Sequence, residues 1–228
     1  MKYNTLLFDL DNTLLDFYDA EKTAFLNTAK IHDLNYSEEN FLQYRKINQK
    51  WWNNYEKGLY TKEEITTNRF KEYLEFINKT GNPTEIHKTY VSSLSLGKKT
   101  VDGAYQVLEY FKNKGCKILV VTNGVATTQK NRLEGQPFNK FIDGVYVSDV
   151  TGFAKPKKEF FDAVQKLSGI TFDKKTIIIG DSLSSDIQGG INIGIDTCYF
   201  NFSNTTLPCD VKPTYVINKL TELIGLFE

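Results

Sequence analysis

Short, continuous apolar runs recur along this chain, bounded by polar residues or glycine. They read TLLFD at 5–9, CKILVVTNG at 116–124, TIIIGD at 176–181, DTCYF at 196–200 and TYVI at 214–217. A run of this length without alternation predicts a strand that is buried on both faces, as in a parallel sheet. Helical spacing lies between the runs, for example at Phe160, Phe161 and Val164. This alternation predicts an α/β core with a doubly wound parallel sheet.

Residues 17–96 interrupt that rhythm. They contain no comparable Ile/Val run and instead carry polar and aromatic stretches with helical spacing, as at Phe70 and Leu74. The sheet pattern resumes after DGAYQVLEYFKNKG, which predicts a helix stopped by its final glycine. We therefore expect an all-helical domain at 17–96, inserted into a core domain made of residues 1–16 and 97–228.

The charges of the chain balance, with 28 Lys and Arg against 28 Asp and Glu among 228 residues. This balance provides no general attraction to nucleic acid or to an anionic membrane, so we expect a small-molecule partner. No stretch approaches the roughly 20 apolar residues of a membrane span, and the N-terminus is too charged for a signal peptide. We expect a cytoplasmic protein.

Cysteine and histidine usage limits the metals that this chain can bind. Cys116, Cys198 and Cys209 are odd in number and widely spaced, which argues against a disulfide framework or a zinc cluster. The histidines are His32 and His87, without paired spacing. Any metal would therefore be held mainly by oxygen, and oxygen ligands favour magnesium over zinc or copper.

Polar residues follow three of the predicted strands. Asp9 ends the first, Thr122 and Asn123 end the second, and Asp181 ends the third. In open parallel sheets, ligands bind beyond the carboxyl ends of the strands, so these side chains should share one crevice. An unpaired, ionised carboxylate is strongly disfavoured in an apolar interior. Asp9 and Asp11, within an otherwise apolar run, therefore indicate metal or phosphate chemistry.

Four segments carry a resemblance to a known family. They are DLDNT at 9–13, VVTNG at 120–124, AKP at 154–156 and GDSLSSD at 180–186. Together and in this order they resemble the signature segments of the haloacid dehalogenase (HAD) superfamily of phosphohydrolases. The resemblance covers essentially the whole chain and implies a Rossmann-like core. It also implies that the insertion is a helical cap of that superfamily's first cap class.

The resemblance implies a Mg²⁺-dependent phosphomonoester hydrolase that works through an aspartyl phosphate. Asp9 would be the nucleophile, because a covalent carboxyl phosphate divides one slow hydrolysis into two steps. Asp11 would protonate the leaving oxygen and then deprotonate the attacking water. The family pattern implies that Mg²⁺ is held by Asp9, Asp181 and the main-chain carbonyl of Asp11.

The remaining motif residues have expected roles around the phosphoryl group. The side-chain hydroxyl of Thr122 is expected to donate to the phosphoryl oxygens. The main-chain amides near Leu10, Asp11 and Asn123 are expected to bind the same group. Lys155 would supply a compact positive charge to the same group during the reaction. Asp186, near the start of the following helix, is expected to orient the metal-bound waters or Lys155.

The substrate is indicated less directly. The opening FDLDNTLLDF and the segment GDSLSSDIQGGINIGIDTCYFN most resemble a bacterial subgroup of pyrimidine 5'-nucleotidases, which implies a nucleoside monophosphate as the substrate. Within the insertion, Trp51, Trp52 and Tyr55 lie near Arg45 and Arg69 in sequence. The aromatic residues could stack on a base while the arginines reach a phosphate, or the aromatic residues could form the core of the cap, and their helical spacing favours packing.

Several other functions share these motifs or this fold. The same catalytic segments serve sugar-phosphate phosphatases, phosphoglycolate phosphatases and β-phosphoglucomutase-like phosphotransferases. A dehalogenase needs no metal and no acid at Asp11. A phospho-acceptor receiver domain is usually much smaller and has no long insertion. A module that only binds is disfavoured, because every motif position keeps its reactive side chain. The sequence does not indicate an oligomeric state.

Overall fold

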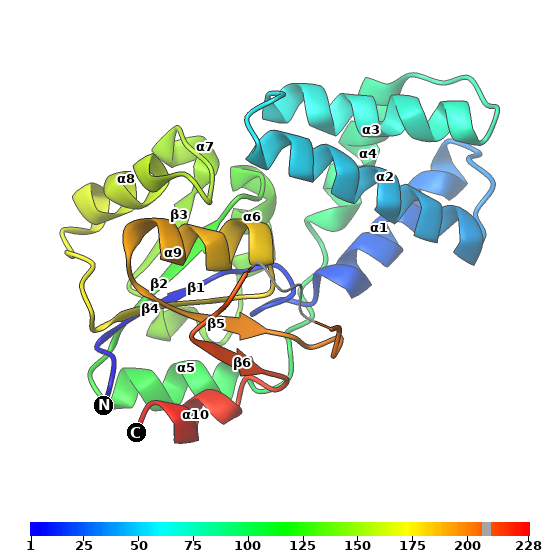
Figure 1. Cartoon of the computed structure of the whole chain (residues 1–228). Helices are drawn as coiled ribbons and strands as arrows, with labels where there is room; N and C mark the ends of the chain where they lie inside the picture. Colours follow the sequence, from blue (N-terminus) through cyan, green and yellow to red (C-terminus); the bar gives the residue numbers. More distant parts are fainter. Residues whose placement is uncertain (207–210) are drawn as a thin grey trace. The chain divides into compact units, whose positions relative to one another are not determined.

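The structure is a computed structural model that describes residues 1–206 and 211–228. Cys209 lies outside the described residues. The chain divides into two compact units (Figure 1). The first unit consists of Met1–Asp16 and Lys99–Glu228, and the second of Phe17–Lys98. None of the helices in the described part of the chain has the length and apolarity that a membrane span requires.

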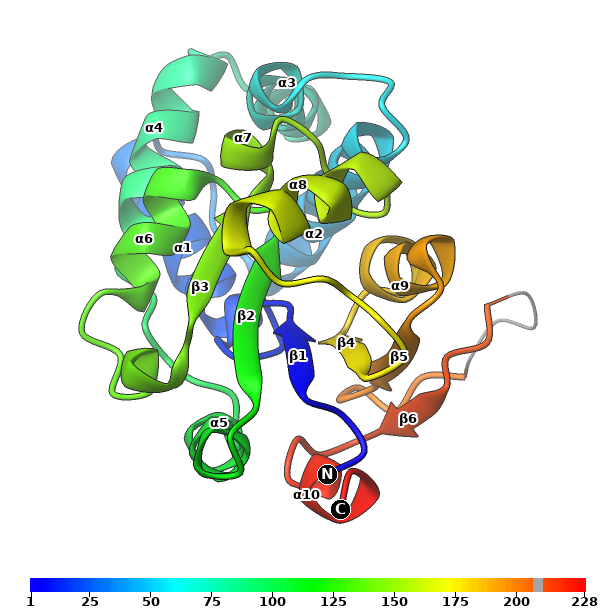
Figure 2. The ribbon, with the colours of Figure 1, turned by 90° about the vertical axis from the view of Figure 1, so that its left-hand side faces the viewer.

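The first unit is built on a sheet of six parallel strands. Their bounds are β1 Thr5–Phe8, β2 Lys117–Thr122, β3 Gly144–Val147, β4 Thr176–Gly180, β5 Asp196–Phe200 and β6 Tyr215–Ile217. Figure 2 shows the strands side by side in the order β3, β2, β1, β4, β5, β6. The register places Leu7 between Leu119 of β2 and Ile178 of β4. These three residues are buried, as the continuous apolar runs predict, and the predicted α/β fold is confirmed.

Helices cover both faces of this sheet (Figure 1). Their bounds are α5 Ala104–Asn113, α6 Ala126–Leu133, α7 Ser148–Thr151, α8 Lys158–Ser168, α9 Gln188–Ile193 and α10 Glu222–Leu226. Leu6 packs in one buried cluster with Phe111 of α5, while Leu7 packs in the opposite cluster with Phe161 of α8. Successive residues of a strand point to opposite faces, so each central strand contributes to both cores.

The second unit is all helical. Its helices are α1 Phe17–Ile31, α2 Glu38–Glu56, α3 Lys62–Phe76 and α4 Pro83–Leu94. Its core is aromatic: the ring of Tyr44 stacks on Phe25 at 4.8 Å and on Phe70 at 5.3 Å between centroids. Thr61 and Glu64 form a reciprocal capping box that begins α3. Local capping and aromatic packing therefore account for the helices of this unit.

Two local features differ from the sequence-based expectations. No apolar run predicts β3, because this short strand lies at the edge of the sheet and only Val147 of its four residues is buried. The helix expected to start near Asp186 begins instead as a π turn, Leu183–Ile187, and continues as α9. Such turns are rare and occur frequently at functional sites.

Candidate active site

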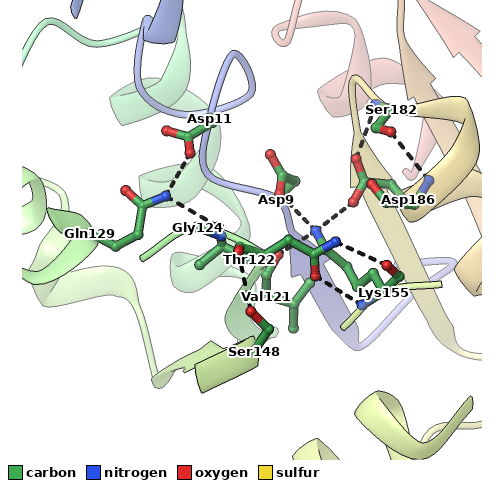
Figure 3. Close-up of polar contacts among 12 residues, drawn as sticks. Asp9, Asp11, Val121, Thr122, Gly124, Gln129, Ser148, Lys155, Ser182 and Asp186 are labelled. Carbon is green, nitrogen blue, oxygen red and sulfur yellow. Dashed lines mark hydrogen bonds and ion pairs between the residues drawn. The ribbon is translucent and has the colours of Figure 1, made fainter. Parts of the chain in front are cut away.

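Three carboxylates meet at the carboxyl ends of two neighbouring strands. Asp9 follows β1, Asp181 follows β4, and Asp186 lies in the π turn after β4. Each offers one oxygen atom to a group in which the oxygens lie within 4.8 Å of one another. Because β1 and β4 pair in parallel, their ends deliver Asp9 and Asp181 to the same place. Figure 3 shows Asp9 and Asp186 on either side of the Lys155 amine.

Lys155 reaches this group from the loop between α7 and α8, and its side chain is only 1% exposed. Its Nζ donates to Asp9 Oδ1 at 2.7 Å, to Asp186 Oδ1 at 2.6 Å and to the Val121 carbonyl at 2.7 Å. An ammonium group has three N–H donors, so every donor of Lys155 is engaged by the chain itself. Lys155 therefore holds two of the three carboxylates in fixed positions.

The charges of this group are only partly balanced. Burial raises the pKa of Asp9 to about 7, although Lys155 opposes the shift, and Asp186 and Asp11 add to it. Burial and the neighbouring carboxylates of Asp9 and Asp186 also raise the pKa of Asp181, against a hydrogen bond from Asn12. Burial alone would lower the pKa of Lys155, but Asp186 and Asp9 outweigh it and raise that pKa.

This donor set fits a divalent cation. Three carboxylates that face one lysine leave about two negative charges to be balanced when all are ionised. Oxygen atoms at this spacing suit a hard cation such as Mg²⁺, which is usually held by one or two carboxylates with waters and substrate phosphate. The metal ligands predicted from the sequence thus include two members of this cluster, Asp9 and Asp181.

Asn123 fixes the main chain of Lys155. Its Nδ2 donates to the Lys155 carbonyl at 2.9 Å, and its Oδ1 accepts the Lys155 amide N–H at 2.9 Å. The sequence motif predicts only a phosphate-binding main-chain amide near Asn123 and does not indicate this role of the side chain. The two residues are 32 positions apart, so no local pattern indicates the pairing.

Asp186 is held from two sides. Oδ1 accepts from Lys155, and Oδ2 accepts the main-chain N–H of Ser182 at 3.1 Å. A Cβ atom at Gly180 would lie 2.2 Å from Oδ2, which is closer than real atoms approach. The glycine of the GDSLSSD segment therefore provides the space in which Asp186 lies beneath the end of β4.

Thr122 ends β2 and is buried, as is Leu10 in the loop after β1. The Thr122 hydroxyl oxygen accepts the Gly124 amide N–H at 3.0 Å and the Gln129 amide at 3.3 Å. With two donors on the oxygen, the hydroxyl proton is directed to a third group. A phosphoryl oxygen placed beside Thr122 could accept this proton in a hydrogen bond.

Asp11 is bound by side chains that the sequence analysis did not identify. Its Oδ2 accepts the Gln129 amide at 2.6 Å, and its Oδ1 accepts Arg132. Both donors lie on α6, and the Arg132 side chain is 0% exposed while that of Asp11 is 25% exposed. The segment ATTQKNRL is typical of an exposed polar helix. The only signal is the three-residue spacing, which places both donors on one helix face.

The aromatic and basic residues singled out in the insertion all contact other residues of the second unit. Trp51 is half-buried and donates to Glu72 at 2.9 Å, and buried Arg69 donates to Asn48 at 2.7 Å. Arg45 pairs with Glu21 at 2.8 Å. Trp52 and Tyr55 are half-buried and meet edge to face at 5.7 Å between centroids. The packing interpretation accounts for Trp51, which packs against the buried cluster of this unit.

Comparison with known proteins identifies a family that this chain matches. A model of the haloacid dehalogenase-like hydrolases matches residues 3–194. YfnB of Bacillus subtilis, described as a HAD-hydrolase, is 35% identical over 97% of this chain and 94% of its own. Two pyrimidine 5'-nucleotidases are also similar. YjjG of Escherichia coli is 28% identical over 98% of this chain and 97% of its own, and PynA of Streptococcus pneumoniae is 29% identical over 100% and 96%.

Solved structures agree with the family match. The crystal structure of YfnB described as bound to magnesium superposes with a TM-score of 0.93, at 34% identity and over 100% of both chains. A dehalogenase structure superposes with a TM-score of 0.78 at 16% identity, covering 99% of this chain and 97% of the other. At that identity the likeness concerns the fold alone.

Proposed function

This chain belongs to the haloacid dehalogenase-like hydrolases, and from that membership we propose that it is a Mg²⁺-dependent phosphomonoester hydrolase. The observation that carries the proposal is the cluster of Asp9, Asp181 and Asp186 around buried Lys155. One carboxylate in this cluster has to attack phosphorus, and Asp9 has the position of the nucleophile in the family's first motif. Lys155 keeps that carboxylate oriented and partly offsets the repulsion between two anions.

In the first step, a carboxylate oxygen of Asp9 forms a bond to phosphorus while the bond from phosphorus to the leaving oxygen breaks. The leaving oxygen takes the electron pair of that bond and a proton from Asp11, which gives the free alcohol and an aspartyl phosphate. The Thr122 hydroxyl donates to a phosphoryl oxygen throughout, together with main-chain amides near Leu10 and Asn123.

In the second step, water attacks phosphorus and gives its proton to the Asp11 carboxylate. The bond between phosphorus and the Asp9 oxygen breaks, and its electron pair restores the Asp9 carboxylate. Inorganic phosphate is the product, and Asp11 carries the proton for the next cycle. Splitting the reaction in this way lets one acid and one nucleophile serve both steps.

The metal would be held by side-chain oxygens of Asp9 and Asp181 and by the main-chain carbonyl of Asp11. When bound, Mg²⁺ neutralises charge between the nucleophile and the phosphoryl oxygens. Asp186 does not need to bind the metal directly, because both of its oxygens already accept hydrogen bonds from Lys155 and Ser182. We assign it the role of holding Lys155.

We propose pyrimidine nucleoside monophosphates as the substrate class. Two relatives named pyrimidine 5'-nucleotidases, YjjG and PynA, align with nearly the whole chain, including the helical insertion in which family members differ. Sugar-phosphate phosphatase, phosphoglycolate phosphatase and phosphotransferase activities are the alternatives, because they use the same core residues. A metal-independent dehalogenase is disfavoured, because that chemistry needs neither a metal held by the carboxylate cluster nor an acid at Asp11.

The test compares the wild-type chain with Asp9→Asn and with Asp162→Asn, which changes an exposed aspartate of α8 in the same way. We expect Mg²⁺-dependent hydrolysis of 4-nitrophenyl phosphate by the wild type and the Asp162 variant, and background rates for Asp9→Asn with its fold retained. Substrate choice is read from UMP, dUMP and dTMP against phosphoglycolate and sugar phosphates. Retained turnover in Asp9→Asn contradicts the mechanism, and a preference for non-nucleotides contradicts the substrate class.

A further inference from the structure

Helix α6 carries a pair of buried donors that both end on Asp11. Gln129 and Arg132 lie three residues apart on one face of the helix, and both side chains are buried. Gln129 donates to Asp11 Oδ2 at 2.6 Å, and Arg132 donates to Asp11 Oδ1. Each oxygen of the carboxylate therefore has its own donor from the same rigid element (Figure 3 shows the Gln129 contact). We call Gln129 and Arg132 the α6 clamp.

The loop before α6 is shaped so that this contact can form. A Cβ atom at Gly124 would lie 2.0 Å from the Nε2 atom of Gln129 and 2.7 Å from its Cδ atom. Only glycine at position 124 lets the Gln129 amide pass to Asp11. The same Nε2 atom lies 3.3 Å from the Thr122 hydroxyl, so Gln129 connects a phosphate-binding residue with Asp11.

Burying a guanidinium group is costly unless it is paired with an anion, so buried Arg132 depends on its ion pair with Asp11. Its partner Asp11 lies in the loop after β1 and has a partly exposed side chain that would otherwise sample several rotamers. Two donors on two different oxygens fix the plane of the carboxylate. They match the ionised form that Asp11 has when it takes the proton of the attacking water, because that form only accepts hydrogen bonds.

We propose that Gln129 and Arg132 are positioning residues that hold the Asp11 carboxylate ready to take the proton of the attacking water. This inference rests on the proposed function, because it assigns the clamp to the second half of that reaction. There, a water oxygen bonds to phosphorus, the bond from phosphorus to Asp9 breaks, and the water proton passes to Asp11. Without the clamp, Asp11 is free to turn away, and the aspartyl phosphate persists.

The kinetics of 4-nitrophenyl phosphate separate the two halves. Its leaving group departs as a stable anion without a proton, so kcat/KM reports attack by Asp9 and does not depend on Asp11. Hydrolysis of the aspartyl phosphate contributes to kcat. Loss of the clamp should therefore lower kcat and KM together and leave kcat/KM nearly unchanged, whereas general damage to the site lowers kcat/KM.

The experiment uses the full chain with Mg²⁺ and the variants Arg132→Met, Arg132→Lys and Gln129→Met, with Lys130→Met as the control. Lys130 is an exposed residue of the same helix. For Arg132→Met and Gln129→Met we expect kcat to fall about 10- to 100-fold, which is no more than the low end of the roughly 100- to 10,000-fold that a positioned acid–base group contributes. A burst of 4-nitrophenolate equal to the enzyme concentration should appear, with phosphate trapped on Asp9 after acid quench. Arg132→Lys should fall between Arg132→Met and the wild type.

The outcomes are distinct. If Arg132→Met does not fold, as judged by circular dichroism, Gln129→Met decides, because it retains the ion pair. An unchanged kcat, or a fall in kcat/KM without a burst, overturns the clamp. If the wild type itself releases no 4-nitrophenolate, the proposed phosphatase function fails, and that result is distinguishable from failure of the clamp.

Discussion

Replacing Lys155 with Met removes the buried cation that contacts Asp9 and Asp186 and leaves their charges facing each other. The variant keeps the length of the side chain and its apolar stem, so the loss is mainly electrostatic. The contacts of 2.7 Å and 2.6 Å each correspond to about 6 kcal/mol at an effective dielectric constant of 20, before the cost of desolvation. Removing one partner of a buried pair typically costs about 3–5 kcal/mol, which we expect for the metal-free first unit at pH 7.

The pH dependence gives the sharper expectation. The pKa of Asp9 is raised to about 7 in the folded wild type, with Lys155 opposing the shift, so it must rise further without Lys155. A raised folded pKa gives stability that is present at low pH and lost as pH rises through the folded value. The wild type therefore stops losing this stability near pH 7, whereas the variant continues to lose about 1.4 kcal/mol per pH unit. Between pH 7.0 and 8.5 the difference should grow by about 2 kcal/mol.

The measurement is urea unfolding in EDTA at pH 7.0 and 8.5. Unfolding of the first unit is monitored by hydrogen exchange of peptides that cover β1 and β4. Tryptophan fluorescence is unsuitable, since Trp51 and Trp52 both lie in the second unit. Lys158→Met is the control, because Lys158 forms an exposed ion pair with Asp162. The effect of this substitution on the free energy of unfolding should be the same at pH 7.0 and 8.5. A difference between variant and wild type that is equal at pH 7.0 and 8.5 would falsify the electrostatic account.

Three further outcomes follow from the same geometry. Mg²⁺ affinity measured by calorimetry should rise at least about 25-fold from pH 5.5 to 7.5, because the pKa of Asp9 is raised to about 7, the pKa of Asp181 is raised as well, and both ligands must be ionised to bind; a flat profile contradicts this. Asn123→Ala removes both hydrogen bonds to the Lys155 main chain and should lower kcat about 10- to 100-fold with the fold retained, while unchanged kcat would assign Asn123 no positioning role. Gly180→Ala places a Cβ atom 2.2 Å from Asp186 Oδ2 and should cost about 1–3 kcal/mol in urea unfolding, and wild-type stability would show that Asp186 can move.

The sheet was predictable to the extent that its strands are buried on both faces. Such strands are apolar along most of their length, and the runs at β1, β2 and β4 carry that signal in the sequence. β3 carries no such signal, because pairing with β2 on one side supplies its order and its other side is an edge. A strand at the edge of a sheet can therefore form from residues that are only half-buried.

The parts of the site that could be predicted are the side chains whose positions are determined by the ends of strands. Asp9 and Asp181 could be brought together from the order of the motifs, because adjacent parallel strands end on the same side. Asn123, Gln129 and Arg132 act through partners 32, 118 and 121 positions away, and their polar side chains look like surface residues in sequence. What distinguishes Gln129 and Arg132 is burial, and what distinguishes half-buried Asn123 is its pairing with a distant main chain. Both are tertiary properties that polar composition does not encode.

The chain compensates its clustered carboxylates unequally, and the inequality indicates where a metal would bind. Asp186 shares Lys155 with Asp9 and has a second donor from Ser182. Asp11 has the two donors of α6. For Asp181, the opposing group among the described residues is a hydrogen bond from Asn12 rather than a cation, and its pKa lies well above the usual range. A carboxylate in this state favours either a proton or an external cation, and in the proposed reaction Mg²⁺ would also neutralise charge on the phosphate.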